Sequence, residues 1–161
     1  MGMVDILNGY IVEASPGYRG GPQERELKTQ LAADIRKHNW SVIGHLPAED
    51  RWPVLHPKMF YAIPDKHLLK YKDPLIIFGG SFKTIAADWE DWLLMFEEML
   101  RKMYWENVHL TLHSEMIGSH QFTWKVKHDW FEKMCNRDLQ PISDWDFTGT
   151  RNFFDGINRI E

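Results

Sequence analysis

Three side chains that can do chemistry lie close together in the segment 106–115, ENVHLTLHSE. His109, Thr111 and His113 alternate with apolar residues, and this period of two predicts a half-buried strand with the polar side chains on one face. Histidine titrates near neutral pH and can act as a general acid, a general base or a metal ligand. The segment is therefore half of a catalytic site, part of a metal site, or the polar face of an ordinary strand.

A metal site needs ligands that converge on one ion. His109 and His113 lie four residues apart, which is about 13 Å along a strand, whereas ligands sit about 2 Å from a zinc ion. His113 could meet His120 across a hairpin, but further ligands would have to come from elsewhere. The chain has a single cysteine, Cys135, and no His-Glu-x-x-His pattern. We therefore expect no metal and no cofactor.

The catalytic alternative rests on a resemblance. Val108-His109-Leu110-Thr111-Leu112 resembles one His-x-Thr motif of the 2H phosphoesterase family. The resemblance implies a histidine that acts as general acid or base, a threonine that steadies the phosphate, and hydrolysis of a phosphoester or nucleotide. The family carries two such motifs on facing strands, and no other histidine here has Ser or Thr two residues later. His109 and Thr111 are thus candidate catalytic residues of half a site.

The interpretation we favour for this segment is the solvated face of a strand, opposite Gln121, Thr123 and Lys125 on the next strand. Other candidate sites are also incomplete. Gly79 and Gly80 are expected to join a strand to a helix, where backbone N–H groups can hold an anion. No Walker or Gly-x-Gly-x-x-Gly pattern accompanies them, so a plain turn is favoured. Cys135 is interpreted as a structural thiol.

The elements that must position these residues follow from the apolar spacing and from Gly- and Pro-rich breaks. Pro22 suits the first turn of a helix. Strands are expected at 4–14, 40–46, 58–63, 75–80, 108–113 and 120–127, and helices at 22–38, 84–104 and 128–136. We expect an α+β fold, in which a mostly antiparallel sheet of four to six strands packs against one long helix, 84–104, and one shorter helix, 22–38.

Composition limits the class of protein. The 161 residues, 43% hydrophobic and 14% aromatic, suit a single α+β domain, 1–161, on which an aromatic-rich C-terminal segment, about 137–161, is expected to pack. The chain has no apolar run of membrane-spanning length and begins without the basic and apolar regions of a secretory signal. With one cysteine, these features predict a cytoplasmic protein that binds no membrane. The net charge of −4 argues against non-specific nucleic-acid binding.

The clearest predicted element is the helix at 84–104, with Ser81 or Thr84 as its N-cap. Helical spacing predicts a buried stripe formed by Ile85, Trp89, Trp92, Leu93, Phe96, Leu100 and Met103. Leu94 and Met95 fall outside this stripe, which indicates that the helix is covered on more than one side.

An acidic surface is the remaining functional signal. Every charged residue between 86 and 100 is acidic, and these residues alternate with large apolar ones. Such a stripe suits a basic protein partner, because charge steers the encounter and tryptophan supplies the anchor. A Trp-rich face equally serves a homodimer. The candidate partner-binding residues are Asp88, Trp89, Glu90, Asp91, Trp92, Glu97 and Glu98.

At the level of the whole chain, the sequence resembles the small acidic immunity proteins that bacteria encode beside polymorphic toxins. The likeness is carried by residues 79–115, by the tryptophan and acidic content, by the size and by the incomplete catalytic set. No family motif is matched residue by residue. The resemblance implies a cytoplasmic protein that binds one cognate toxin and covers its active site or substrate groove. The alternatives are the 2H-phosphoesterase-like hydrolase and, third, an accessory protein of phage or plasmid origin.

Overall fold

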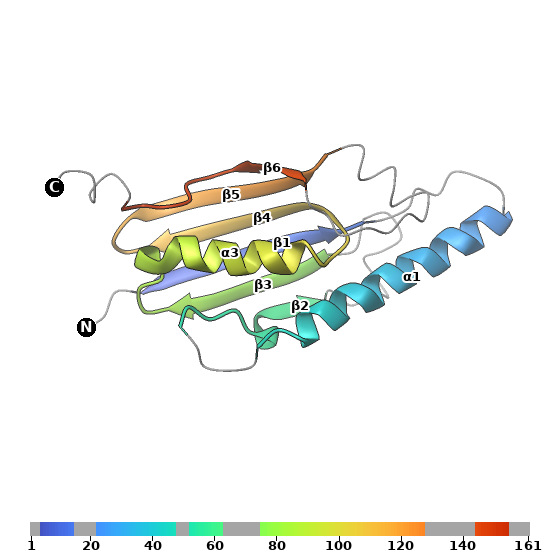
Figure 1. Ribbon diagram of the computed structural model, residues 1–161, viewed down its shortest axis with the longest axis horizontal. Coiled ribbons are helices and arrows are strands. Elements are labelled where there is room, and N and C mark those ends of the chain that lie inside the picture. Colours follow the sequence, from blue (N-terminus) through green and yellow to red (C-terminus); the bar gives the residue numbers. More distant parts are fainter. Residues whose placement is uncertain (1–3, 15–21, 48–51, 63–74, 128–143, 155–161) are drawn as a thin grey trace.

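The computed structural model describes residues 4–14, 22–47, 52–62, 75–127 and 144–154, and these ranges form an antiparallel sheet with two α-helices (Figure 1). The six strands are β1 Asp5–Glu13, β2 Phe60–Ala62, β3 Leu75–Phe82, β4 Trp105–Ser114, β5 Gly118–Val126 and β6 Trp145–Thr148. Their order across the sheet is β2-β3-β1-β4-β5-β6. The helices are α1 Pro22–Gly44 and α3 Trp89–Leu100, with 3₁₀ turns at Pro57–Met59 and Ala86–Asp88. The predicted α+β class and antiparallel sheet are confirmed.

One face of the sheet is covered by α3, which runs along its middle strands (Figure 1). Alternate strand residues point to this face and are buried; they include Leu7, Ile11, Ile76, Phe78, Val108, Leu110, Leu112, Phe122 and Trp124. The predicted inward stripe of the helix is confirmed, because Ile85, Trp89, Trp92, Leu93, Phe96, Leu100 and Met103 are each at most 1% exposed. Burying each such side chain stabilises the fold by roughly 1.5–3 kcal/mol.

The start of the segment that carries α3 is capped from a distant strand rather than by a neighbour. Asp5 on β1 accepts hydrogen bonds through Oδ2 from the backbone N–H groups of Ile85, at 2.8 Å, and Ala86, at 3.1 Å. Neither Ser81 nor Thr84 forms the cap, so that prediction is wrong. A buried carboxylate here satisfies orphan donors and complements the positive end of the helix.

Helix α1 is longer than predicted, and the expected strand at 40–46 is wrong because α1 continues to Gly44. Apolar or buried positions recur every four residues and keep the helix packed on the domain. Ile35 and Ile43 are buried, and between them Asn39 is fully buried, with Nδ2 donating to the Tyr104 carbonyl and Oδ1 accepting from the Tyr104 N–H. With 23 residues, α1 is the longer helix and α3, with 12, is the shorter, the reverse of the expected order.

The predicted hairpin is present as β4 and β5, joined by the turn 115–117. Gly79 and Gly80 lie within β3 and pair with β1, so the predicted strand-to-helix turn at these glycines, and with it an anion site, is wrong. Cys135 and the predicted helix at 128–136 lie outside the described residues. Neither described helix has the length and apolar character needed to span a membrane.

Candidate functional site

The face of β4 that carries His109 and Thr111 lies on the side of the sheet opposite α3. His109 is exposed, and its ring stacks on that of Tyr10 on β1, with centroids 4.9 Å apart. Across β5, Thr123 lies opposite His109, and Gln121 lies opposite Thr111, as the alternation predicted. These are the cross-strand pairs of a solvent-facing sheet surface.

The other histidines of the hairpin do not complete a site with His109. Nδ1 of His113 lies 2.8 Å from the Ser119 hydroxyl, on the same face. The register places His120 on the opposite face, where its ring packs against Phe153 at 4.7 Å. His113 and His120, which the sequence allowed to meet across the hairpin, therefore lie on opposite faces of the sheet. Among the described residues, no three His, Cys, Asp or Glu side chains gather as metal ligands.

The structure divides the seven candidate partner-binding residues of the 86–100 segment into two groups. Trp89, Trp92 and Glu97 point into the domain and are at most 2% exposed, so they are core residues rather than surface anchors. These residues are buried because they lie on the inward side of the helix. An indole buried in the core cannot contact a partner at the surface. The others reach the surface to different degrees, and they are Asp88, Glu90, Asp91 and Glu98.

One flank of α3 is closed by residues 144–154. Arg151 forms a bidentate pair with Glu97, its Nη1 and Nη2 donating to Oε1 and Oε2 at 2.6 and 2.9 Å. Trp124 on β5 donates to the same carboxylate at 3.3 Å. Near the start of the helix, Trp89 donates to the Thr150 carbonyl at 3.2 Å. We call this the closed flank, because these buried and part-buried polar contacts hold residues 150 and 151 against α3.

The charge of Glu97 is matched to this environment. Burial raises the pKa of its carboxyl, but the hydrogen bonds and charge of Arg151, assisted by Trp124 and Arg101, outweigh burial and leave the pKa below its ordinary value of 4.5. Glu97 is therefore ionised at neutral pH and serves the fold.

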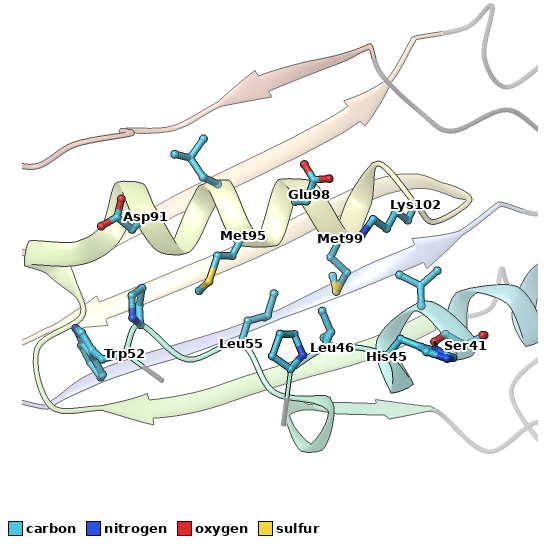
Figure 2. A pocket seen from close by; sticks show the side chains of 14 residues that line it. Ser41, His45, Leu46, Trp52, Leu55, Asp91, Met95, Glu98, Met99 and Lys102 are labelled. Carbon is cyan, nitrogen blue, oxygen red and sulfur yellow. Dashed lines mark hydrogen bonds between the residues drawn. The ribbon is translucent and has the colours of Figure 1, made fainter. Parts of the chain in front are cut away.

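The opposite flank of α3 opens into a groove of about 940 Å³ that lies between α3, the last turns of α1 and the segment 52–55 (Figure 2). We call it the α1–α3 groove. Its floor is apolar and includes Val42, Leu46, Leu55, Met95 and Met99. In Figure 2 Met95 and Met99 point from α3 toward Leu46 and Leu55. Methionine side chains are flexible, so this floor can accommodate apolar side chains of different shapes.

The rim of the α1–α3 groove on the α3 side is charged. Asp91 and Glu98 are exposed, and Leu94 between them is 52% exposed. Positions 91, 94, 95 and 98 follow helical spacing, so they form a second, outward stripe of α3, which Lys102 in the following turn extends. Glu98 also contacts Arg101 at 3.2 Å, a surface pair with side chains 62% and 43% exposed, which is weak in water.

Two of the seven candidates, Asp88 and Glu90, are not among the residues that line this groove. Asp88 is half-buried and accepts a hydrogen bond from the indole of Trp52, which lines the groove. Glu90 is exposed and accepts from Asn152 at 3.2 Å on the closed flank. The groove is therefore flanked directly by Asp91 and Glu98, and its far end carries Lys102 and His45.

Half of the groove was missed by sequence reasoning. The place of Leu94 and Met95 outside the inward stripe was visible in the sequence, but the expected cover over this second side is wrong for Leu94, which is 52% exposed, while Met95 is partly buried. The contribution of Val42 and Leu46 was not, because residues 40–46 were interpreted as a strand. Continuing the four-residue spacing of α1 through Asn39 to Ile43 would have placed them correctly.

The chain matches no protein-family model, and comparisons with curated proteins and with solved structures find no match. The chemistry of the groove and of the sheet face is therefore the basis for assigning function.

Proposed function

We propose that the protein is a protein-binding module of the immunity or inhibitor type, which neutralises a cognate basic toxin in the cytoplasm by direct contact. The observation that carries this proposal is the α1–α3 groove, an apolar hollow of about 940 Å³ bordered by the exposed carboxylates of Asp91 and Glu98. The contact would be made by the outward stripe of α3 rather than by its buried tryptophans.

The chemistry of this surface suits a protein more than a small polar ligand. An apolar patch bordered by polar residues is the usual arrangement of a protein interface, whose centre is desolvated while its rim stays wet. Lys102 lies at the far end of the groove and Glu98 contacts the exposed Arg101, whereas the rim between positions 91 and 98 carries two exposed carboxylates. They would steer a basic partner toward the groove and disfavour acidic ones.

The hydrolase alternative has less support. His109 and Thr111 lie on the open sheet face and not in the groove, and His109 stacks on Tyr10. Within the described residues, this face offers no second His-x-Thr motif on a facing strand. No feature of the described residues favours an accessory role of phage or plasmid origin.

The test is affinity capture followed by a neutralisation assay. The immobilised protein is exposed to lysate of its source cell, washed, and the retained proteins are identified by mass spectrometry. We expect one stoichiometric basic protein whose retention falls as salt is raised. Expressed alone, that protein should arrest growth, and co-expression of the present chain should restore it.

Charge reversal supplies the matched control. The variant Asp91→Lys/Glu98→Lys should lose capture and rescue, while Glu115→Lys/Asp146→Lys, with the same net charge change on exposed residues away from the groove, should keep both. Asp91 and Glu98 are preferred to Asp88, because Asp88 holds the Trp52 indole and its loss would disturb local structure. No retained protein, or a retained protein that is harmless when expressed alone, would contradict the proposal.

A further inference from the structure

We infer that the α1–α3 groove receives one amphipathic helix of the partner, with two basic side chains seven residues apart and an apolar side chain row between them. This inference rests on the proposed function and specifies which part of the partner the groove recognises. It follows from the spacing of charge and apolar surface along α3.

The spacing of the two rim carboxylates sets the first requirement. Asp91 and Glu98 are seven residues apart on one helix, which places them about 10.5 Å apart along its axis, on nearly the same side. A second helix lying alongside α3 reproduces this distance with residues at i and i+7. An extended strand would cover it in about three residues, where successive side chains alternate between faces and fit the row poorly.

The surface between the carboxylates sets the second requirement. Leu94, 52% exposed, and Met95, partly buried, lie between Asp91 and Glu98 and lead down to the floor at Met99 and Leu55. On a facing helix the matching positions are i+3 and i+4, so these should be apolar. Helix-in-groove recognition uses such anchors at i, i+3, i+4 and i+7.

The far end of the groove sets the direction. Lys102, in the turn that follows α3, lies four residues beyond Glu98, and His45, directly after α1, lines the same end (Figure 2). The rim thus changes from acidic to basic along α3. A partner helix that runs antiparallel to α3 is favoured, because the two helix dipoles then point in opposite directions. From its N-terminus, this helix should carry an acidic residue facing Lys102, a basic residue four positions later facing Glu98, and a second basic residue seven positions after that facing Asp91. We write this pattern as acidic-x3-basic-x6-basic. The reverse polarity would bring like charges together.

The probe for this inference is a synthetic helix rather than an unidentified protein. A lactam-stapled, fluorescein-labelled peptide carries the acidic-x3-basic-x6-basic pattern, with lysine as the base, glutamate as the acid, and leucines at the intervening apolar positions. A second peptide keeps the composition and staple, but one lysine is moved by two residues so that it no longer lies on the face that meets α3. A third replaces both lysines by glutamate. Binding to the full chain is followed by fluorescence anisotropy, with helicity checked by circular dichroism.

We expect the first peptide to bind about tenfold or more tightly than the second or third, with affinity that falls as salt is raised. Asp91→Lys/Glu98→Lys should lose this preference and instead bind the third peptide most tightly, because its glutamates then face lysines. A misfolded variant could not gain affinity for that peptide. Glu115→Lys/Asp146→Lys should behave like the wild-type chain. Equal affinity for the first two peptides, or no binding by any of them, would overturn the inference.

Failure of the inference can be distinguished from failure of the proposed function. If the peptides fail while Asp91→Lys/Glu98→Lys still abolishes capture of a growth-arresting protein, the groove binds that protein through a different shape, and only the helix is wrong. If capture finds no such protein while the peptide results hold, the groove binds basic helices and the inhibitor role is wrong.

Discussion

The two flanks of α3 are built from the same short helix and yet have different properties. On the closed flank, Trp89 and Glu97 are at most 2% exposed and are fastened by Thr150, Trp124 and Arg151. On the groove flank, Leu94 is 52% exposed, and the neighbouring carboxylates face solvent. The comparison indicates that one side of an α-helix can stabilise the fold while the other side binds a partner. Matched substitutions on the two flanks test this division.

The largest contrast should come from truncating one large side chain on each flank. Trp89 packs against Trp92, Phe122 and Phe153, so Trp89→Ala should cost about 3–5 kcal/mol of the free energy of unfolding. Leu94→Ala should change it by less than about 0.5 kcal/mol, because Leu94 is already half exposed. Urea denaturation of the two variants measures both values, and equal losses would mean that the groove flank also supports the fold.

A second contrast uses glycines. Gly149 on the closed flank has φ of +148°, and an added Cβ would meet the ring of Phe122 and lie 3.1 Å from that of Phe147. Gly149→Ala should therefore cost about 1–3 kcal/mol through strain and overpacking. Gly44, at the end of α1, has nothing within 4 Å of such a Cβ, so Gly44→Ala should stabilise by about 0.5–1 kcal/mol. Thermal unfolding of both variants should show shifts of opposite sign, and a destabilised Gly44→Ala would contradict the open space found around Gly44.

The third contrast is between adjacent glutamates and depends on pH. Glu97→Gln leaves Arg151 with a weaker partner and should cost about 1–2 kcal/mol at neutral pH, whereas Glu98→Gln should be nearly neutral. The pKa of Glu97 is lower in the folded than in the unfolded chain, so its stabilisation is present above the ordinary value of 4.5 and is lost as pH falls through the lowered folded value.

The Glu97→Gln variant should therefore lose less stability than the wild-type chain as pH falls below 4.5. Urea midpoints of the wild type and both variants, taken at neutral pH and at several acid values, test this. Parallel acid profiles for wild type and Glu97→Gln would show that the Glu97–Arg151 pair does not contribute to acid stability.

The charge reversal that matters most for binding should have only a small effect on folding. Asp91→Lys/Glu98→Lys removes a favourable charge from the first turn of α3 and a weak surface pair with Arg101, which together should cost at most about 1 kcal/mol. Urea denaturation at neutral pH checks this. A much larger loss would show that these carboxylates hold the helix in place and would remove the variant as a test of binding.

The sequence predicted the architecture better than the site. Local period-two and helical spacing predicted β1, β3, the β4–β5 hairpin and the inward stripe of α3, because each depends on residues near one another in the chain. The cap supplied by Asp5 to Ile85 and Ala86 could not be predicted, since it joins positions 80 and 81 residues apart. The same holds for the pair between Glu97 and Arg151.

The acidic segment shows why the site was only half predictable. Its charges and apolar residues were read as one surface, although helical spacing assigns Trp89, Trp92 and Glu97 to the inward side. The outward side becomes a groove only when the end of α1 and the segment 52–55 lie beside it. Residues 40–46 are rich in β-branched and aromatic residues, and their tertiary contacts overrode that strand propensity.

The most direct test of the central claim, that recognition belongs to the groove flank of α3, is site-specific photocrosslinking. A photoreactive phenylalanine analogue is placed at Leu94 in one sample and at Tyr61, 65% exposed on the open sheet face, in another. Each is irradiated with the captured basic partner, and the products are identified by mass spectrometry. We predict an adduct from position 94 that maps to one helix of the partner, and none from position 61. An adduct from position 61 alone would contradict the account.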